Sequence, residues 1–157
     1  MPDRSLAFDL HVLTARLDRE ADRLLRAHLG LPYRRFLALV LVGEGAPTQK
    51  VLAERLGVTE PSTSRMVGVL AAAGLLDVSP DPAGGNRRRL ALSPFGREQV
   101  EACAALLEGR FAGLVGRSGV GYERYAADTR RLVRALDGIP DDAADGAPGP
   151  TPTGPEA

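Results

Sequence analysis

Apolar residues recur along this chain at spacings that predict helices over most of its length. Over residues 5–29 they lie three, four or seven positions apart among charged residues, the pattern of one face of an amphipathic helix (Leu6, Leu10, Leu13, Leu17, Leu24 and Leu25). We expect Gly30 to end this helix and Pro32 to begin the next. The run from 36 to 42 is apolar on every side, so the second helix should lie in the centre of the core.

Residues 48–76 predict two short helices joined by a tight turn. Thr48 is placed to cap a helix that ends at Leu56, and Thr59 is placed to cap the next one. Between them, Gly57 stands where the end of a helix requires a positive φ. Pro61 is compatible with the second helix, because N–H groups in the first turn have no intrahelical partner. This is the pattern of a helix-turn-helix.

The second of these helices has two different faces. Apolar groups, including one threonine methyl, recur at the spacing of a buried stripe (Thr63, Met66, Val67 and Leu70). The opposite face holds small or hydrogen-bonding groups (Glu60, Ser62, Ser64, Arg65 and Gly68). Such a face suits the major groove of DNA. The alternative is an αα-hairpin of an ordinary helical bundle, which also has caps, a glycine and a polar outer face.

The segment that follows favours DNA binding. Gly74 ends the helix, and Leu75–Val78 and Leu90–Leu92 are short apolar strands. The stretch SPDPAGGNRRR between them is rich in glycine and arginine, as expected of an exposed basic loop. Two strands joined by such a loop predict a β-wing beside the helix-turn-helix.

Two further helices should follow the wing, over about 94–115 and 122–136. Ser93 and Pro94, a capping hydroxyl and a first-turn proline, open the first of them, and glycines within 116–121 separate the two. The last helix has an apolar edge that a small winged domain does not need for its own core (Leu132, Val133 and Leu136). This edge predicts a contact with a partner.

Together these stretches resemble the MarR family of winged helix-turn-helix transcriptional regulators. The resemblance covers about residues 5–138 and rests on GLPYRRF at 30–36, VLAERLGVTEPSTSRMVGVL at 51–70, the GLL exit into the wing at 74–76, and LALSPFG at 90–96. Members of the family usually have an Asp-Arg pair at the wing tip, in a pattern like DPxDRRxxxLxLT. Here Gly84 and Gly85 occupy that place, and the arginines are displaced along the chain.

The resemblance implies a mainly α fold with a two-stranded β-wing and N- and C-terminal dimerisation helices. We expect a single regulator domain over 1–138, with a DNA-binding lobe at about 32–92 and dimerisation helices at about 5–29 and 94–137. Such a protein is a homodimer that binds double-stranded DNA at an inverted-repeat operator. A ligand-responsive repressor is the function that this implies.

Eight residues are candidates for contact with DNA. The second helix of the helix-turn-helix is the one that would enter the major groove, and we call it the recognition helix. Ser62, Ser64 and Arg65 should approach base edges from this helix. The other five should contact phosphates, from the first helix of the motif and from the wing in an adjacent groove (Lys50, Arg55, Arg87, Arg88 and Arg89).

An effector site is also implied by the resemblance. In proteins similar to this one, a small anionic or aromatic effector binds in the crevice between the dimerisation helices and the DNA-binding lobe. The residues that would line it here are His11, Arg16, Tyr33 and Phe36. The alternative is that His11 is a half-exposed helix residue and that Tyr33 and Phe36 belong to the core.

The distribution of charge supports a partner with phosphates. An apolar content of 44% and a charged content of 25% are ordinary for a soluble globular protein. The net charge of zero averages two regions, because none of the 20 basic residues but five of the 20 acidic ones lie from Asp137 onward. Residues 139–157, rich in proline, glycine and acid, should be a disordered solubilising tail. An alternative role for this tail is competition with DNA for the basic face.

The sequence offers no constellation typical of an enzyme or of a cofactor site. His11, His28 and Cys103 are too scattered to indicate a metal site or Cys-His catalysis. Small apolar neighbours favour a buried, inert Cys103 over a redox sensor. Neither a signal peptide nor a membrane-length apolar run is visible, so we expect a cytoplasmic protein. The alternative function is a winged-helix module that binds protein or senses a small molecule without binding DNA.

Overall fold

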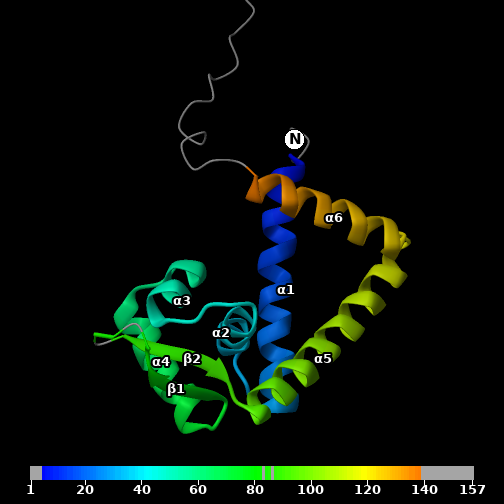
Figure 1. Ribbon diagram of the computed structural model, residues 1–157. Helices are drawn as coiled ribbons and strands as arrows, with labels where there is room; N and C mark the ends of the chain where they lie inside the picture. Colours follow the sequence, from blue (N-terminus) through cyan, green and yellow to red (C-terminus); the bar gives the residue numbers. More distant parts are fainter. Residues whose placement is uncertain (1–4, 83, 86, 139–157) are drawn as a thin grey trace, which may run out of the picture. The chain divides into compact units, whose positions relative to one another are not determined.

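The computed structural model describes residues 5–82, 84–85 and 87–138. Within them, six helices and one two-stranded antiparallel sheet follow one another along the chain (Figure 1). The elements are α1 (Leu6–Leu29), α2 (Tyr33–Gly43), α3 (Gln49–Leu56), α4 (Glu60–Ala72), β1 (Leu76–Pro80), β2 (Arg88–Leu92), α5 (Pro94–Ser118) and α6 (Tyr122–Asp137). This confirms the predicted fold class. The predicted tail, 139–157, lies outside the described residues.

Side-chain caps and left-handed glycines set the helix ends where the sequence predicted them. The Thr48 hydroxyl accepts the N–H of Val51 at 3.3 Å, and the Thr59 hydroxyl accepts the N–H of Ser62 at 3.4 Å. Gly57, between the two helices, has φ 65°, a conformation that residues with a Cβ rarely adopt. The helix-turn-helix is therefore specified by local interactions.

One apolar core holds α1 to α4, the sheet and the start of α5 together. Leu25, Leu39, Leu52 and Leu70, from four different helices, are its largest fully buried apolar side chains. Thr63 is also buried, and its hydroxyl donates to the carbonyl oxygen of Thr59 at 3.1 Å, so it adds no unsatisfied donor to the core. The predicted stripe of α4 and the central place of α2 are both confirmed.

Asp22 joins α1 to the beginning of α2. One carboxylate oxygen accepts the N–H of Tyr33 at 2.9 Å, and the other accepts Arg26 Nε at 2.6 Å. The hydrogen bond from Arg26, and then that from the Tyr33 N–H, hold the pKa of Asp22 below its usual value. The carboxylate thereby satisfies a helix N-terminus that has no side-chain cap of its own.

The wing is longer than the sequence predicted. Strands β1 and β2 pair from Leu76–Leu92 to Pro80–Arg88, so Arg88 and Arg89 lie in a strand and not in the loop. The predicted ends at Val78 and Leu90 were wrong because pairing continues past the apolar residues that marked the strands. The N–H of Leu90 also donates to the carbonyl oxygen of Pro47 at 2.8 Å, which attaches the wing to the start of α3.

The chain divides into two compact units, which meet within α5 at residues 110 and 111. In the second unit, the rings of Phe111 and Tyr125 are 6.3 Å apart and pack the end of α5 on α6. The sequence predicted that α5 ends near Val115, but it continues to Ser118, whose hydroxyl donates to the carbonyl oxygen of Val115 at 2.7 Å. Among the described helices, none is apolar over enough of its length to cross a bilayer.

Candidate nucleic-acid interface

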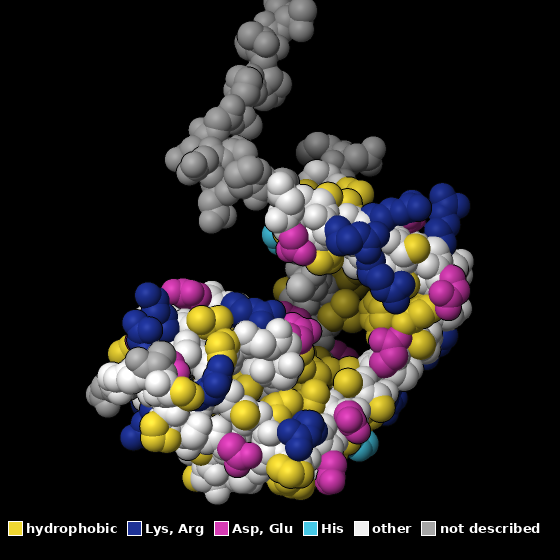
Figure 2. Space-filling view, in the orientation of Figure 1, with side chains coloured by type: hydrophobic (Ala, Val, Ile, Leu, Met, Phe, Trp, Pro, Cys, Tyr) yellow, Lys and Arg dark blue, Asp and Glu magenta, His cyan; other side chains and the backbone are white. Residues whose placement is uncertain are grey.

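A crevice of about 760 Å³ opens between the first turns of α3 and α4 and the wing. We call it the basic crevice, and its lining residues are Thr48, Gln49, Lys50, Val51, Glu60, Ser64, Arg87 and Arg88. Figure 2 shows that Lys and Arg side chains gather at this end of the lobe. Four of the eight predicted contact residues, Lys50, Ser64, Arg87 and Arg88, therefore lie around one opening.

Local structure brings these side chains together. The turn at Gly57 joins the end of α3 to the start of α4, and residues of the first turns of both helices line the crevice. The wing is fixed beside them, because Thr48 forms a β-bridge with Arg89. The starts of two consecutive helices and the wing thus form one surface.

The cations of the crevice are available for an external ligand. Lys50, Arg87 and Arg88 are exposed and form no ion pair with any residue that the structure describes. Exposed cations without partners contact phosphates without first breaking an internal interaction.

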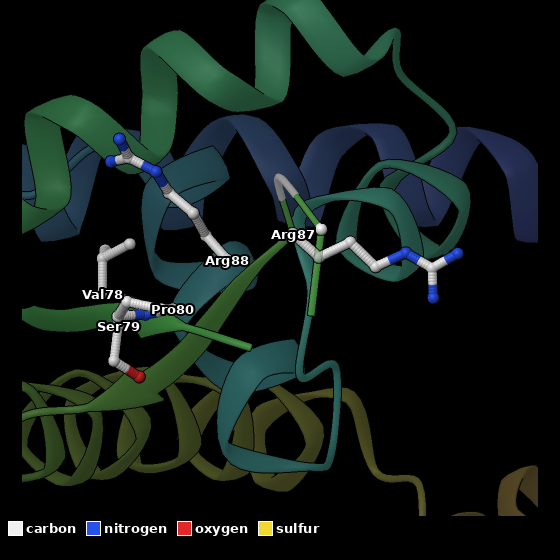
Figure 3. A pocket seen from close by; sticks show the side chains of 6 residues that line it. Val78, Ser79, Pro80, Arg87 and Arg88 are labelled. Carbon is white, nitrogen blue, oxygen red and sulfur yellow. The ribbon is translucent and has the colours of Figure 1, made fainter. Parts of the chain in front are cut away.

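The wing arginines point in different directions. Figure 3 shows the side chains of Arg87 and Arg88 diverging from the wing, beside a hollow of about 340 Å³ that Val78, Ser79 and Pro80 also line. Arg89 follows Arg88 in β2 and pairs with Ser79 across the sheet, so its side chain alternates to the other face. The three arginines therefore cover both sides of the wing.

Arg55 is the predicted phosphate ligand that the structure separates from the others. Its guanidinium donates to a carboxylate oxygen of Glu44 at 3.0 Å and to the carbonyl oxygen of Leu41 at 3.4 Å. These bonds tie α3 to the end of α2. Arg55 would reach a phosphate only after the ion pair opened, since the carboxylate already occupies its side chain.

Two polar residues of α4 lie outside the lining of the basic crevice. Ser62 is half-buried, and Arg65 is exposed on the outer face of the helix. Arg65 follows Ser64 directly, about 100° further around the helix axis. It therefore extends the polar surface of α4 beyond the crevice.

Gln49 and Glu60 line the basic crevice, although the sequence did not single out either as a contact residue. The sequence nevertheless contains a feature that both residues share. Each is the first residue after a capping threonine, in the first turn of a helix of the helix-turn-helix.

The predicted effector residues are only partly brought together. The rings of Tyr33 and Phe36 are 6.1 Å apart, with Phe36 buried in the core and Tyr33 half-buried. Burial, and then the neighbouring Asp18, raise the pKa of Tyr33. His11 and Arg16 are exposed on α1, and His11 lies about 10 Å along the helix from Asp18. The structure thus places Tyr33 and Phe36 in contact and His11 away from them.

Cys103 is fully buried in the core, as the sequence favoured. Burial raises the pKa of its thiol, which disfavours the reactive thiolate. Within the described part of the chain, no three His, Cys, Asp or Glu side chains cluster as metal ligands would.

Comparison with known proteins agrees with this geometry. A sequence model described as MarR family matches residues 29–86, which hold α2 to α4 and β1. An HTH-type transcriptional regulator of Mycobacterium tuberculosis is 35% identical over 101 residues, which cover 64% of this chain and 70% of that protein. The chain belongs to the MarR family. This MarR-family protein is a DNA-binding transcriptional regulator.

Solved structures share its fold. The complex of Staphylococcus aureus MepR with DNA has a TM-score of 0.66 at 18% identity and covers 87% of this chain and 100% of that one. A MarR-family protein of Mycobacterium tuberculosis in complex with salicylic acid has a TM-score of 0.66 at 21% identity, covering 85% and 98%. The regulator MosR of the same organism, in complex with DNA, has a TM-score of 0.59 at 25% identity, covering 85% and 97%.

Proposed function

We propose that this MarR-family regulator is a ligand-responsive repressor that binds an inverted-repeat operator as a homodimer. The observation that carries the proposal is the basic crevice, where cations from α3 and the wing, which form no ion pair with a described residue, flank the start of α4. A recognition helix that enters the major groove by its first turns needs phosphate ligands on both of its sides.

Each element then has its own role on the duplex. Ser62, Ser64 and Arg65 approach base edges from α4, with Arg65 as the long donor that suits guanine. Lys50 contacts a phosphate from α3. The wing arginines contact phosphates of the adjacent groove.

Assembly through the terminal helices would supply the second half-site. The apolar side chains of Leu6 on α1 and of Leu132 and Leu136 on α6 are 73%, 63% and 70% exposed. Large apolar side chains at such exposure are typical of a surface that another chain covers. We therefore propose one regulator domain over 1–138, whose terminal helices pack against those of a second copy. A cytoplasmic location follows from the proposal, because the operator DNA lies there.

A small aromatic or anionic effector would act by changing the distance between the two recognition helices. A protein of the same fold has been solved with salicylic acid, which supports this class of ligand. The contact between the rings of Tyr33 and Phe36 supports their place in this site, and His11 and Arg16 would join them where a second protomer completes the pocket.

Footprinting on the DNA that flanks the gene for this protein tests the proposal. We expect two protected half-sites related by a two-fold axis, with centres about 10 bp apart. A single unrepeated half-site would contradict the dimeric mode. Protection that is the same on every sequence would contradict specific recognition.

A further inference from the structure

Among the described residues that line the basic crevice, one carries a carboxylate. Glu60 is the first residue of α4, directly after the capping Thr59, and its side chain is exposed. Ser64 lies one helical turn later, on the same face, and lines the crevice as well. The other charged side chains of the lining are Lys50, Arg87 and Arg88.

Glu60 is not neutralised by these neighbours. It forms no ion pair with a residue that the structure describes, whereas Glu44 on the same lobe holds Arg55 at 3.0 Å. Its carboxylate is therefore free to meet a ligand. The negative charge of Glu60 repels a phosphate, whereas the neighbouring cations attract one.

The chemistry of the major groove leaves one good partner for such a group. Guanine presents only acceptors there, and thymine presents an acceptor and a methyl group. Adenine offers a donor, but its N7 acceptor lies beside it. Cytosine alone presents a donor, the N4 amino group, without an acceptor of its own, and a carboxylate accepts from it.

We propose that Glu60 is a specificity-determining residue that selects a cytosine in each operator half-site. The first turn of a recognition helix is the part that approaches base edges, and Glu60 begins that turn. A carboxylate at this position also stabilises the helix through its dipole, a role that needs no DNA. The inference rests on the proposed sequence-specific binding. Its test therefore distinguishes a failure of the inference about Glu60 from a failure of the proposed function.

The experiment selects binding sites from a pool of random duplexes with three proteins: the wild type, Glu60→Gln and Glu101→Gln. Glu101 is an exposed acid of α5, so its replacement removes the same charge away from the crevice. We expect the wild type and Glu101→Gln to select a C·G pair at one position of each half-site. Glu60→Gln should lose that preference or replace it with adenine, which glutamine recognises, and should keep the rest of the motif.

Titration of each protein with duplexes that differ only at this base pair measures the size of the preference. Replacement of the selected C·G pair by T·A should weaken binding of the wild type by about 5- to 150-fold and leave Glu60→Gln nearly unaffected. If Glu60→Gln selects the wild-type motif unchanged, the inference is wrong and the proposed function stands. If the wild type itself selects no motif, both are wrong. Thermal unfolding of both variants reports any effect that Glu60 has on the helix alone.

Discussion

At the scale of single residues, Ser93 and Gly96 connect the recognition helix to α5. The Ser93 hydroxyl donates to the carbonyl oxygen of Gly74 at 2.6 Å and accepts the N–H of Gly96 at 2.8 Å. The N–H of Ser93 donates to the carbonyl oxygen of Leu75 at 3.2 Å. These hydrogen bonds join the end of α4, the wing and the start of α5. A displacement of α5 would therefore also displace the end of α4.

Gly96 permits this close approach because it has no side chain. A Cβ at this position would overlap the carbonyl oxygen of Leu75, whereas a Cβ at Gly109 in the same helix would meet nothing within 4 Å. We expect Gly96→Ala to lower the free energy of unfolding by about 1–3 kcal/mol. Gly109→Ala should instead raise it by up to about 1 kcal/mol through helix propensity. Urea denaturation measures both, and equal shifts would contradict the close approach.

Arg65 is the residue from which we expect the largest effect on specificity. Arg65→Ala should weaken operator binding by about 1–3 kcal/mol and weaken binding to random DNA much less, since Arg65 contacts a base only on the operator. Fluorescence anisotropy titrations measure both affinities. Arg130→Ala removes the same charge from the exposed surface of α6 and serves as the control. An equal weakening on both duplexes would make Arg65 a phosphate ligand.

At the scale of elements, the sequence predicted best what local interactions determine. Both ends of α3 and the start of α4 were predicted to within one residue, because Thr48, Thr59 and Gly57 act on the backbone within a few positions of themselves. The end of β1 and the start of β2 were missed, because strand pairing joins residues that are distant in sequence and continues through arginines.

The same distinction applies to the candidate site. Lys50, Ser64 and the wing arginines could be proposed from their place in the motif. The ion pair that holds Arg55 could not, because its partner Glu44 is 11 residues away, directly after the end of α2. Glu60 was assigned to the polar face of α4, yet only the assembled crevice shows that it is the one acid among the described lining residues, beside Lys50, Arg87 and Arg88.

The wing as an element should contribute affinity more than specificity. Replacement of Arg87, Arg88 and Arg89 by alanine should weaken binding to operator and random DNA about equally. It should also reduce the slope of log K against log salt by about 0.9 for each phosphate that the wing no longer neutralises. A variant that kept its salt slope and lost only its preference for the operator would show that the wing reads groove shape or bases.

At the scale of the whole molecule, dimerisation determines whether two recognition helices act together. Size-exclusion chromatography with light scattering at micromolar concentration should give twice the chain mass of 16.6 kDa. Leu132→Glu combined with Leu136→Glu should shift the protein towards the monomer, because two charges would enter the apolar contact. Wild-type protein that stayed monomeric would contradict both the dimer and the paired half-sites.

The central claim is that the surface around the basic crevice and α4 distinguishes one DNA sequence from others. The most direct measurement is the affinity of the full chain for the footprinted operator and for a shuffled duplex of the same composition, over a series of salt concentrations. We predict an operator affinity higher by a factor of about 10³ or more at physiological salt, with both affinities falling as salt rises. Equal affinities for the two duplexes at every salt concentration would contradict the claim.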